Sequence, residues 1–248
     1  MCLIVFAWRP AHAMPLVLAA NRDEFYARPS LPLAAWEDAP GLYGGRDLEA
    51  GGTWLGVGPG GRFAALTNIR DPRQPPFGRS RGELAVQFLR SPLGPEAFLA
   101  DLARRAGDYS AFNLLIGDDR QLWLLNSREG TPEQLPEGLY GLSNAALDTP
   151  WPKVRKGKEL FRECLIDPQP AALLDLLHDA QQPPDAALPD TGVGLNTERL
   201  LSSIFIATRS YGTRASTVLL VNADGSRQLI ERSYGPYGAR LGEVRIEC

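Results

Sequence analysis

Two short segments near the start of the chain are apolar at nearly every position, and they constrain the fold more than any other feature. Residues 2–7 read CLIVFA and residues 15–20 read PLVLAA. A strand that is apolar on both faces must be covered on both faces, so each segment belongs inside a layered structure. Turn-forming residues at 9–12 join them. We therefore predict that residues 2–7 and 15–22 are adjacent antiparallel strands near the centre of one sheet.

The rest of the chain alternates groups of short strands with pairs of helices. We expect helices at 81–91, 95–107, 151–165 and 170–180, and strands at 54–57, 62–67, 112–118, 121–127, 138–144, 203–210, 216–222 and 227–235. This order predicts an α+β fold, a four-layer αββα sandwich of two antiparallel sheets flanked by helices. No linker rich in Gly, Ser or charge divides the chain, so residues 1–248 are expected to form a single domain.

Charge and cysteine content exclude several classes of function. The formal net charge is −3 with both signs interspersed, which argues against nucleic acid as a partner. Cys2, Cys164 and Cys248 are too scattered for a disulfide framework or a zinc site, so no metal site is expected. No segment approaches the ~20 apolar residues that cross a bilayer, and no signal peptide is recognisable. We therefore expect no transmembrane segment and a cytoplasmic location.

Cys2 is the first candidate for chemistry, because removal of Met1 would place a thiol and the chain's α-amine on one residue. An α-amine has a pKa of roughly 7.7–8.0 and a thiol one of roughly 8.5, so the amine can serve as the base without a histidine. The alternative is that Cys2 is a small buried hydrophobic residue that begins a strand. Its position alone leaves both interpretations open.

A polar stretch, NRDEF at 21–25, ends the second apolar segment. A solvated strand end is the simpler interpretation. In the predicted hairpin, however, this stretch lies beside Cys2. Arg22 would then favour the thiolate, and Asp23 would hold the terminal amine by a charge-assisted hydrogen bond.

Three more polar residues follow or begin apolar strands, namely Asn68, Asn144 and Arg214. Side-chain amides are common donors in oxyanion holes, and arginine can hold a carboxylate or a phosphate. Each residue is a weak signal by itself, since asparagine is frequent in turns.

Motifs spread over nearly the whole chain are MCLIVFAW, LVLAANRDEFYARP, GGRDLEAGGTWLG, FAALTNIRDP, GLSNAALDTPWPKV and YGTRASTVLLV. Together they resemble the NRDE family, named for the motif at 21–24, whose eukaryotic members are called transport and Golgi organisation proteins. That family is remotely similar to N-terminal nucleophile hydrolases of the choloylglycine hydrolase and penicillin V acylase type. The resemblance implies the same αββα sandwich.

In those acylases an N-terminal cysteine is the nucleophile, supported by an Arg, an Asp, one or two Asn and a late Arg. The resemblance assigns these catalytic places to Cys2, Arg22, Asp23, Asn144 and Arg214, with Asn68 as a further match. It implies hydrolysis of an acyl amide at a non-peptide C–N bond, for which no cofactor is required. Glu24 has no role that the acylases supply.

The alternative function is a carrier without turnover, because the family is also associated with haem trafficking and with lipid or acyl-CoA handling. In this case haem is a transported ligand, and an acyl-CoA would bind through its phosphates and its acyl chain. The residues expected to contact a ligand are Asn21, Arg22, Glu24, Arg46, Asn68 and Arg70. Only His12 and His178 could supply an imidazole to haem iron, and a lone histidine is more often structural.

Strand alternation creates a conflict in the NRDE motif. It sends Arg22 and Glu24 to one face of the sheet, and Asn21 and Asp23 to the other. The acylase resemblance requires both Arg22 and Asp23 at the thiol, so we predict a bulge or turn at about residue 22 or 23. Glu24 is then expected to pair with an arginine, and Asn21 to bond to loop backbone.

Overall fold

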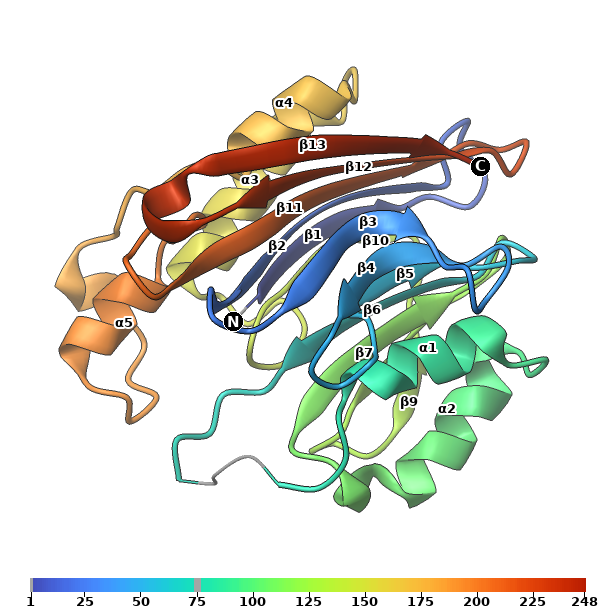
Figure 1. Cartoon of the computed structure of the whole chain (residues 1–248), viewed down its shortest axis with the longest axis horizontal. Coiled ribbons are helices and arrows are strands. Elements are labelled where there is room, and N and C mark those ends of the chain that lie inside the picture. The colour runs from blue at the N-terminus through green and yellow to red at the C-terminus, as the bar shows by residue number, and fades with distance from the viewer. Residues whose placement is uncertain (1, 74–76) are drawn as a thin grey trace.

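The computed structural model describes residues 2–73 and 77–248, and it consists of two antiparallel sheets that face each other (Figure 1). Helices cover the outer face of each sheet (Figure 1). The predicted order of four layers, αββα, is therefore confirmed.

The first sheet contains the N-terminal hairpin. Within the described residues it has six strands in the order β10 (Gly138–Leu142), β1 (Cys2–Trp8), β2 (Leu16–Phe25), β11 (Tyr211–Val221), β12 (Arg227–Tyr234) and β13 (Arg240–Glu247). The first two strands of the chain lie side by side in its interior, with β10 and β11 as their outer neighbours. The predicted central, antiparallel hairpin is confirmed.

The second sheet is formed by the middle of the chain. In the described ranges it has seven strands in sequence order, β3 (Ser30–Ala35), β4 (Tyr43–Asp47), β5 (Leu55–Val57), β6 (Phe63–Asn68), β7 (Phe112–Gly117), β8 (Leu122–Asn126) and β9 (Pro132–Gln134). Its edge strand β3 lies against β12 and β13 of the first sheet. Glu231 of β12 ties the two sheets together there, since its Oε1 accepts the main-chain N–H of Leu33 at 2.7 Å.

Among the residues that the structure describes, two helices pack on each sheet. They are α1 (Gly82–Arg90) and α2 (Pro95–Arg104) on the second sheet, and α3 (Pro152–Cys164) and α4 (Pro170–Leu176) on the first. A further helix, α5 (Leu195–Leu201), lies beyond one end of the first sheet (Figure 1). No helix in the described part of the chain combines the length and apolar character needed to span a membrane.

The two faces of β1 enter two different apolar cores, which explains why its sequence is apolar throughout. Ile4 and Phe6 pack between the sheets, whereas Leu3 and Val5 pack under α3 and α4. The side chains of all four are fully buried. Gly157 lets α3 approach closely, because a Cβ there would lie 3.2 Å from Val5 Cγ1.

One predicted strand is wrong, and the expected strands do not include β3, β4, β9 or β13. Residues 203–206 are buried, but residues 203–210 form no strand, because their main-chain groups bond to side chains and loops instead of a ladder. Ile204 O accepts from Asn21, and the Ile206 N–H donates to Thr213 Oγ1. The closing meander is completed by β13, whose largely exposed, charged edge position gave only a weak apolar signal.

The first residue of α1 packs directly against the main chain of residues 52 and 53. A Cβ on Gly52 would lie 2.4 Å from the carbonyl carbon of Gly82, and the Thr53 N–H donates to Gly82 O at 3.1 Å. This contact fixes where the helix begins relative to β5.

Gly52→Ala is therefore expected to destabilise the protein by about 2 kcal/mol, because backbone must move to admit one methyl group. Equilibrium unfolding in urea measures the change. Gly107→Ala is the control, since a Cβ at Gly107 meets no atom within 4 Å. Equal stability of the two variants would contradict the close contact.

Candidate active site

Cys2 and Arg22 face each other across the first hairpin. They are direct partners in the β1–β2 register. Facing residues of an antiparallel pair project to the same side of a sheet, and both of these side chains line a cleft of about 710 Å³ between the two sheets. Cys2 is only 8% exposed, so its side chain is largely shielded from solvent.

Burial is the main influence on the Cys2 thiol. It raises the thiol pKa, and the Asp23 carboxylate adds to that increase. Arg22 and the main-chain N–H of Asp23, which donates to the sulfur, oppose it. The net pKa is raised, so the thiol is protonated at neutral pH and needs a base to become a nucleophile.

Asp23 lies on the other face of β2 and is also buried. Its Oδ1 accepts a hydrogen bond from Thr213 Oγ1 at 2.8 Å. Burial raises the pKa of Asp23, and the positive charge of Lys153 opposes that increase. A buried carboxyl group thus lies behind the thiol, while Arg22 lies beside it in the cleft.

The predicted break in β2 is wrong. The strand is continuous through Phe25, and its register with β1 continues to Arg22. A bulge does occur opposite Arg22 and Asp23, but it lies in the neighbouring strand β11. The register of β11 with β2 shifts there between Thr213 and Ala215. Arg214 is the extra residue. Asp23 reaches the sulfur through its main-chain N–H, so β2 does not need to change which face its side chain occupies.

Asn144 holds the main chain at Cys2. The Cys2 N–H donates to Asn144 Oδ1 at 3.2 Å, and Asn144 Nδ2 donates to the main-chain oxygen of Asn68 at 2.7 Å. Ser143 Oγ donates to the main-chain oxygen of Cys2 at 2.8 Å. The loop after β10 therefore links the start of β1 to the end of β6. The Asn68 side chain itself lines the cleft.

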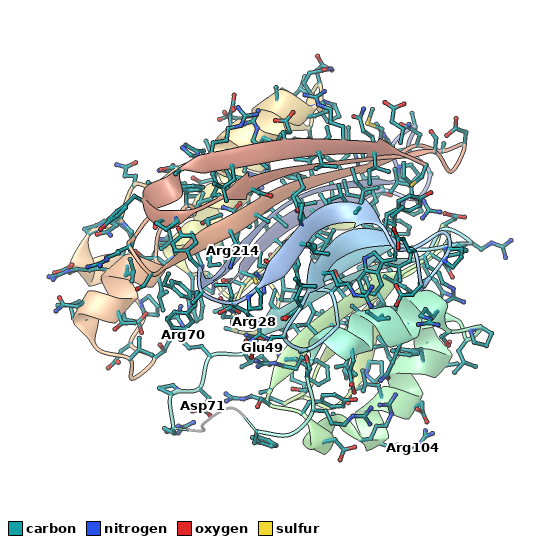
Figure 2. All side chains as sticks on the ribbon, viewed as in Figure 1. Arg28, Glu49, Arg70, Asp71, Arg104 and Arg214 are labelled. Atoms are coloured by element: carbon teal, nitrogen blue, oxygen red, sulfur yellow. The ribbon has the colours of Figure 1, made fainter. Side chains whose placement is uncertain are left out.

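Arg214 holds the turn that follows β2. Its Nη1 donates to the main-chain oxygens of Phe25, Tyr26 and Arg28 at 3.0, 3.1 and 2.7 Å. Its Nη2 donates to Ser30 Oγ at 3.0 Å. Arg214 and Arg28 lie together on the cleft side of the first sheet (Figure 2). Arg214 lines the cleft, but most of its donors serve the fold.

Two residues expected to contact a ligand do not line the cleft. Arg70 Nη1 pairs with the buried Glu198 at 2.6 Å, and its guanidinium lies over the Trp151 ring. Asn21 is fully buried and donates to the main-chain oxygens of Leu177 and Ile204 at 2.8 and 2.9 Å. The predicted bonding of Asn21 to loop backbone is confirmed.

Glu24 and Arg46 do line the cleft. Glu24 Oε2 lies 3.8 Å from Arg22 Nη2, which confirms the predicted pairing of Glu24 with an arginine. Arg46 donates through two nitrogens to the Asp38 carboxylate, at 2.7 and 2.9 Å. Both residues therefore already have partners within the chain.

Lys153 is a charged residue at the site that the sequence did not single out. It is the second residue of α3 and only 2% exposed, and its Nζ has no hydrogen-bond partner in the described ranges. Burial lowers the Lys153 pKa, while the neighbouring Asp23 raises it. The charge of Lys153 also interacts with Cys2, which places the lysine near the Cys2 end of β1. In the sequence, the only indication of a special role for Lys153 is its place in the WPKV motif at 151–154.

The family model described as Transport and Golgi organisation 2 matches residues 1–236. The Transport and Golgi organization 2 homolog of Mus musculus is 38% identical over 256 residues, which cover 94% of this chain and 93% of the mouse protein. The Transport and Golgi organization protein 2 of Drosophila melanogaster is 32% identical over 265 residues, with 94% of this chain and 92% of the fly protein covered.

A solved structure with the same fold is that of a mutant conjugated bile acid hydrolase from Clostridium perfringens. The TM-score is 0.53 at 7% sequence identity, and the match covers 100% of this chain and 92% of the hydrolase chain. At this identity the likeness concerns the fold alone. The predicted N-terminal nucleophile hydrolase-like fold is confirmed.

Removal of the Lys153 charge should cost stability in a pH-dependent way. Lys153→Met leaves Asp23 without its buried counter-charge, and we expect a loss of about 3 kcal/mol at about pH 8. A carboxyl group whose folded pKa is raised loses stability as pH rises through that pKa. The loss should therefore be smaller at about pH 5, and unfolding in urea at both pH values measures it.

Lys156→Met is the matched control, because Lys156 lies on the same helix but pairs with Asp179 at the surface. Its effect should be small at both pH values. A Lys153→Met variant whose stability loss did not depend on pH would show that the lysine does not interact with Asp23.

Proposed function

The chain belongs to the Transport and Golgi organisation 2 family, and from that premise and the geometry around Cys2 we propose that it is an N-terminal cysteine amidohydrolase that cleaves an acyl amide. The observation that carries the proposal is the bond from the Cys2 nitrogen to Asn144 Oδ1, beside a thiol that lines a cleft. After removal of Met1 this nitrogen would be the chain's α-amine. Met1 itself lies outside the described residues.

The free amine would supply the base that the buried thiol lacks. In the first half-reaction the Cys2 thiol passes its proton to the amine, and the sulfur forms a bond to the substrate carbonyl carbon. The amine then gives that proton to the leaving nitrogen as the C–N bond breaks. In the second half-reaction water attacks the thioester, the amine takes the water proton and returns it to the sulfur, and a carboxylic acid leaves.

Two amide side chains are suited to the oxyanion of each half-reaction. Asn144 uses one N–H of its amide on Asn68 O, and an amide carries two. The Asn68 side chain lines the cleft and makes no hydrogen bond within the described ranges. Either donor could lie near the carbonyl oxygen of a substrate bound at Cys2, where it would stabilise developing negative charge.

Turnover of N-dodecanoyl-4-nitroanilide, followed by release of the coloured amine, tests the proposal. Cys2→Ser should lower the rate by about 10³-fold or more, because the nucleophile is lost. Cys164→Ser is the matched control and should retain the wild-type rate. Equal rates for wild type and Cys2→Ser would refute the proposal.

Substitutions in the NRDE motif separate catalysis from folding. Arg22→Ala and Asp23→Ala should abolish turnover while the fold survives, because these residues flank the thiol and the amine. Glu24→Ala should mainly lower the melting temperature, because Glu24 bonds to Arg22 and to the Phe25 N–H. Rates and thermal unfolding of the three variants measure both quantities. A functional loss confined to Glu24→Ala would reverse the assignment.

A carrier for haem or a fatty-acyl thioester is the second candidate, and the cleft's content of arginine favours it. The arginines that line the cleft are Arg22, Arg28, Arg46, Arg79, Arg81 and Arg214. His12 and His178 do not line it, so an imidazole ligand for haem iron would have to come from elsewhere.

Titration of haemin and dodecanoyl-CoA into the Cys2→Ser protein tests this candidate without turnover. Arg22→Ala should weaken binding by about 10- to 100-fold, the expected loss for a hydrogen bond to a charged group. Affinity no greater than that of an unrelated carrier protein, for both ligands, would remove the support for it.

A further inference from the structure

Most arginines of the cleft are already bound to partners within the chain. Arg28 pairs with Asp47 at 2.7 Å and with Glu49 at 2.9 Å. Arg79 pairs with Glu83 at 2.7 Å. The side chains of Arg46 and Arg214 are held by Asp38 and by the turn after β2, as described above. None of these four can bind a ligand without giving up an existing partner.

Arg81 is different. It directly precedes α1 and lines the cleft. In the described part of the chain it has no carboxylate within ion-pair distance, and its one hydrogen bond is a long contact of 3.3 Å from Nη1 to Ala111 O. A guanidinium carries five N–H donors in a planar fork, so most of those of Arg81 are unused. A half-buried cation with unused donors suits an anion from outside the chain.

The thiol is not the partner that Arg81 lacks. Arg22 is the arginine that lowers the Cys2 pKa, whereas Arg81 is not among the groups that shift it appreciably. In its thiolate form Cys2 would act on Arg81, because that charge opposes the lowering of the Arg81 pKa by burial. The guanidinium is thus within electrostatic reach of the thiol. The start of α1 adds positive potential beside it.

No acidic residue of the cleft forms an ion pair with Arg81 within the described ranges. Glu24 is the carboxylate whose charge acts on Arg81, but it pairs with Arg22. The other cleft carboxylates interact elsewhere: Asp47 and Glu49 with Arg28, Glu243 with Arg232, Asp23 with Thr213, and Glu231 with the Leu33 N–H. Most donors of the Arg81 guanidinium are therefore available to a ligand in the cleft.

The cleft also has an exposed apolar wall where β3 lies against β13. Leu31 of β3 is 51% exposed and Leu241 of β13 is 69% exposed, and both line the cleft together with Val244. Large apolar side chains this exposed are candidates for covering by a ligand. The same cleft thus holds an apolar surface, a thiol and an uncommitted arginine.

We propose that Arg81 binds an anionic group in the cleft, and that the ligand is an amphiphile that combines an acyl chain with a carboxylate or phosphate group. The acyl chain lies along Leu31 and Leu241, and the anion binds the guanidinium. This proposal rests on the proposed function in one respect, namely that the acyl carbonyl of the ligand lies at the Cys2 thiol. If the protein is a hydrolase, its substrates are then anionic acyl amides rather than neutral ones.

Calorimetric titration of three ligands with the same chain length into Cys2→Ser protein tests the proposal. They are N-dodecanoylglycine, which carries a carboxylate, dodecyl phosphate, and the neutral N-dodecanoylethanolamine. We expect at least one anionic ligand to bind more tightly than the neutral one. Arg81→Gln should weaken that anionic ligand by about 10- to 100-fold and leave the neutral one unchanged. The anionic ligand whose affinity falls in Arg81→Gln shows whether the guanidinium binds a carboxylate or a phosphate.

Arg79→Gln is the matched control, because Arg79 lines the same cleft but pairs with Glu83. It should leave all three affinities unchanged. The proposal is overturned if Arg81→Gln weakens charged and neutral ligands equally, if it weakens neither, if Arg79→Gln has the same effect, or if none of the three ligands binds. Binding to Cys2→Ser is measured without turnover, so failure of the hydrolase proposal would give a separate result.

Discussion

The pairing of β1 with β2 inside a doubly covered sheet is the constraint on which the site depends. Both strands are apolar on both faces, so they are stable only between two layers of the fold. The register is then strongly specified, because a slip of one residue would move every side chain to the opposite core. That register places Cys2 opposite Arg22 at the end of the hairpin. The polar motif meets the thiol as a consequence of the hydrophobic pattern.

The hairpin end separates the charges onto two faces of the first sheet. Arg22 and Glu24 share one face of β2, whereas Asp23 lies on the other face, borders the cleft and interacts with the charge of Lys153. A buried carboxyl group and a buried lysine are each costly alone, and their proximity reduces the cost of both. The thiol lies between these environments. Arg22 lowers the pKa of the thiol and Asp23 raises it.

The sequence was sufficient to predict the central hairpin, the αββα layers and the position of Arg22 opposite Cys2, because alternation and hairpin geometry are local rules. The predicted break that was to bring the Asp23 side chain to the same face is absent from β2. The sequence was insufficient where the outcome depended on a distant partner. Arg70 resembled a ligand-binding arginine, but Glu198 of α5 neutralises it. Nothing local shows that Lys153 is buried, since a lysine in the first turn of a helix is ordinarily exposed.

The strand errors have the same origin. Residues 203–210 are as apolar as a strand, yet their main-chain groups are bonded by Asn21 and Thr213, which are far away in sequence. The lack of a strong partner for Arg81 can also be seen only in the structure. Six arginines line the cleft, and the partners of the others distinguish the one that remains uncommitted in the described ranges.

The central claim is that Cys2, with its own amine as base, is the nucleophile. Mass spectrometry of the N-terminal peptide, from protein quenched with acid during turnover of an acyl amide, tests this claim most directly. The account predicts a peptide that begins at Cys2 and carries the acyl group on sulfur, removable by hydroxylamine. A peptide that still begins at Met1, or an acyl group found on Cys164 or Cys248 instead, would contradict it.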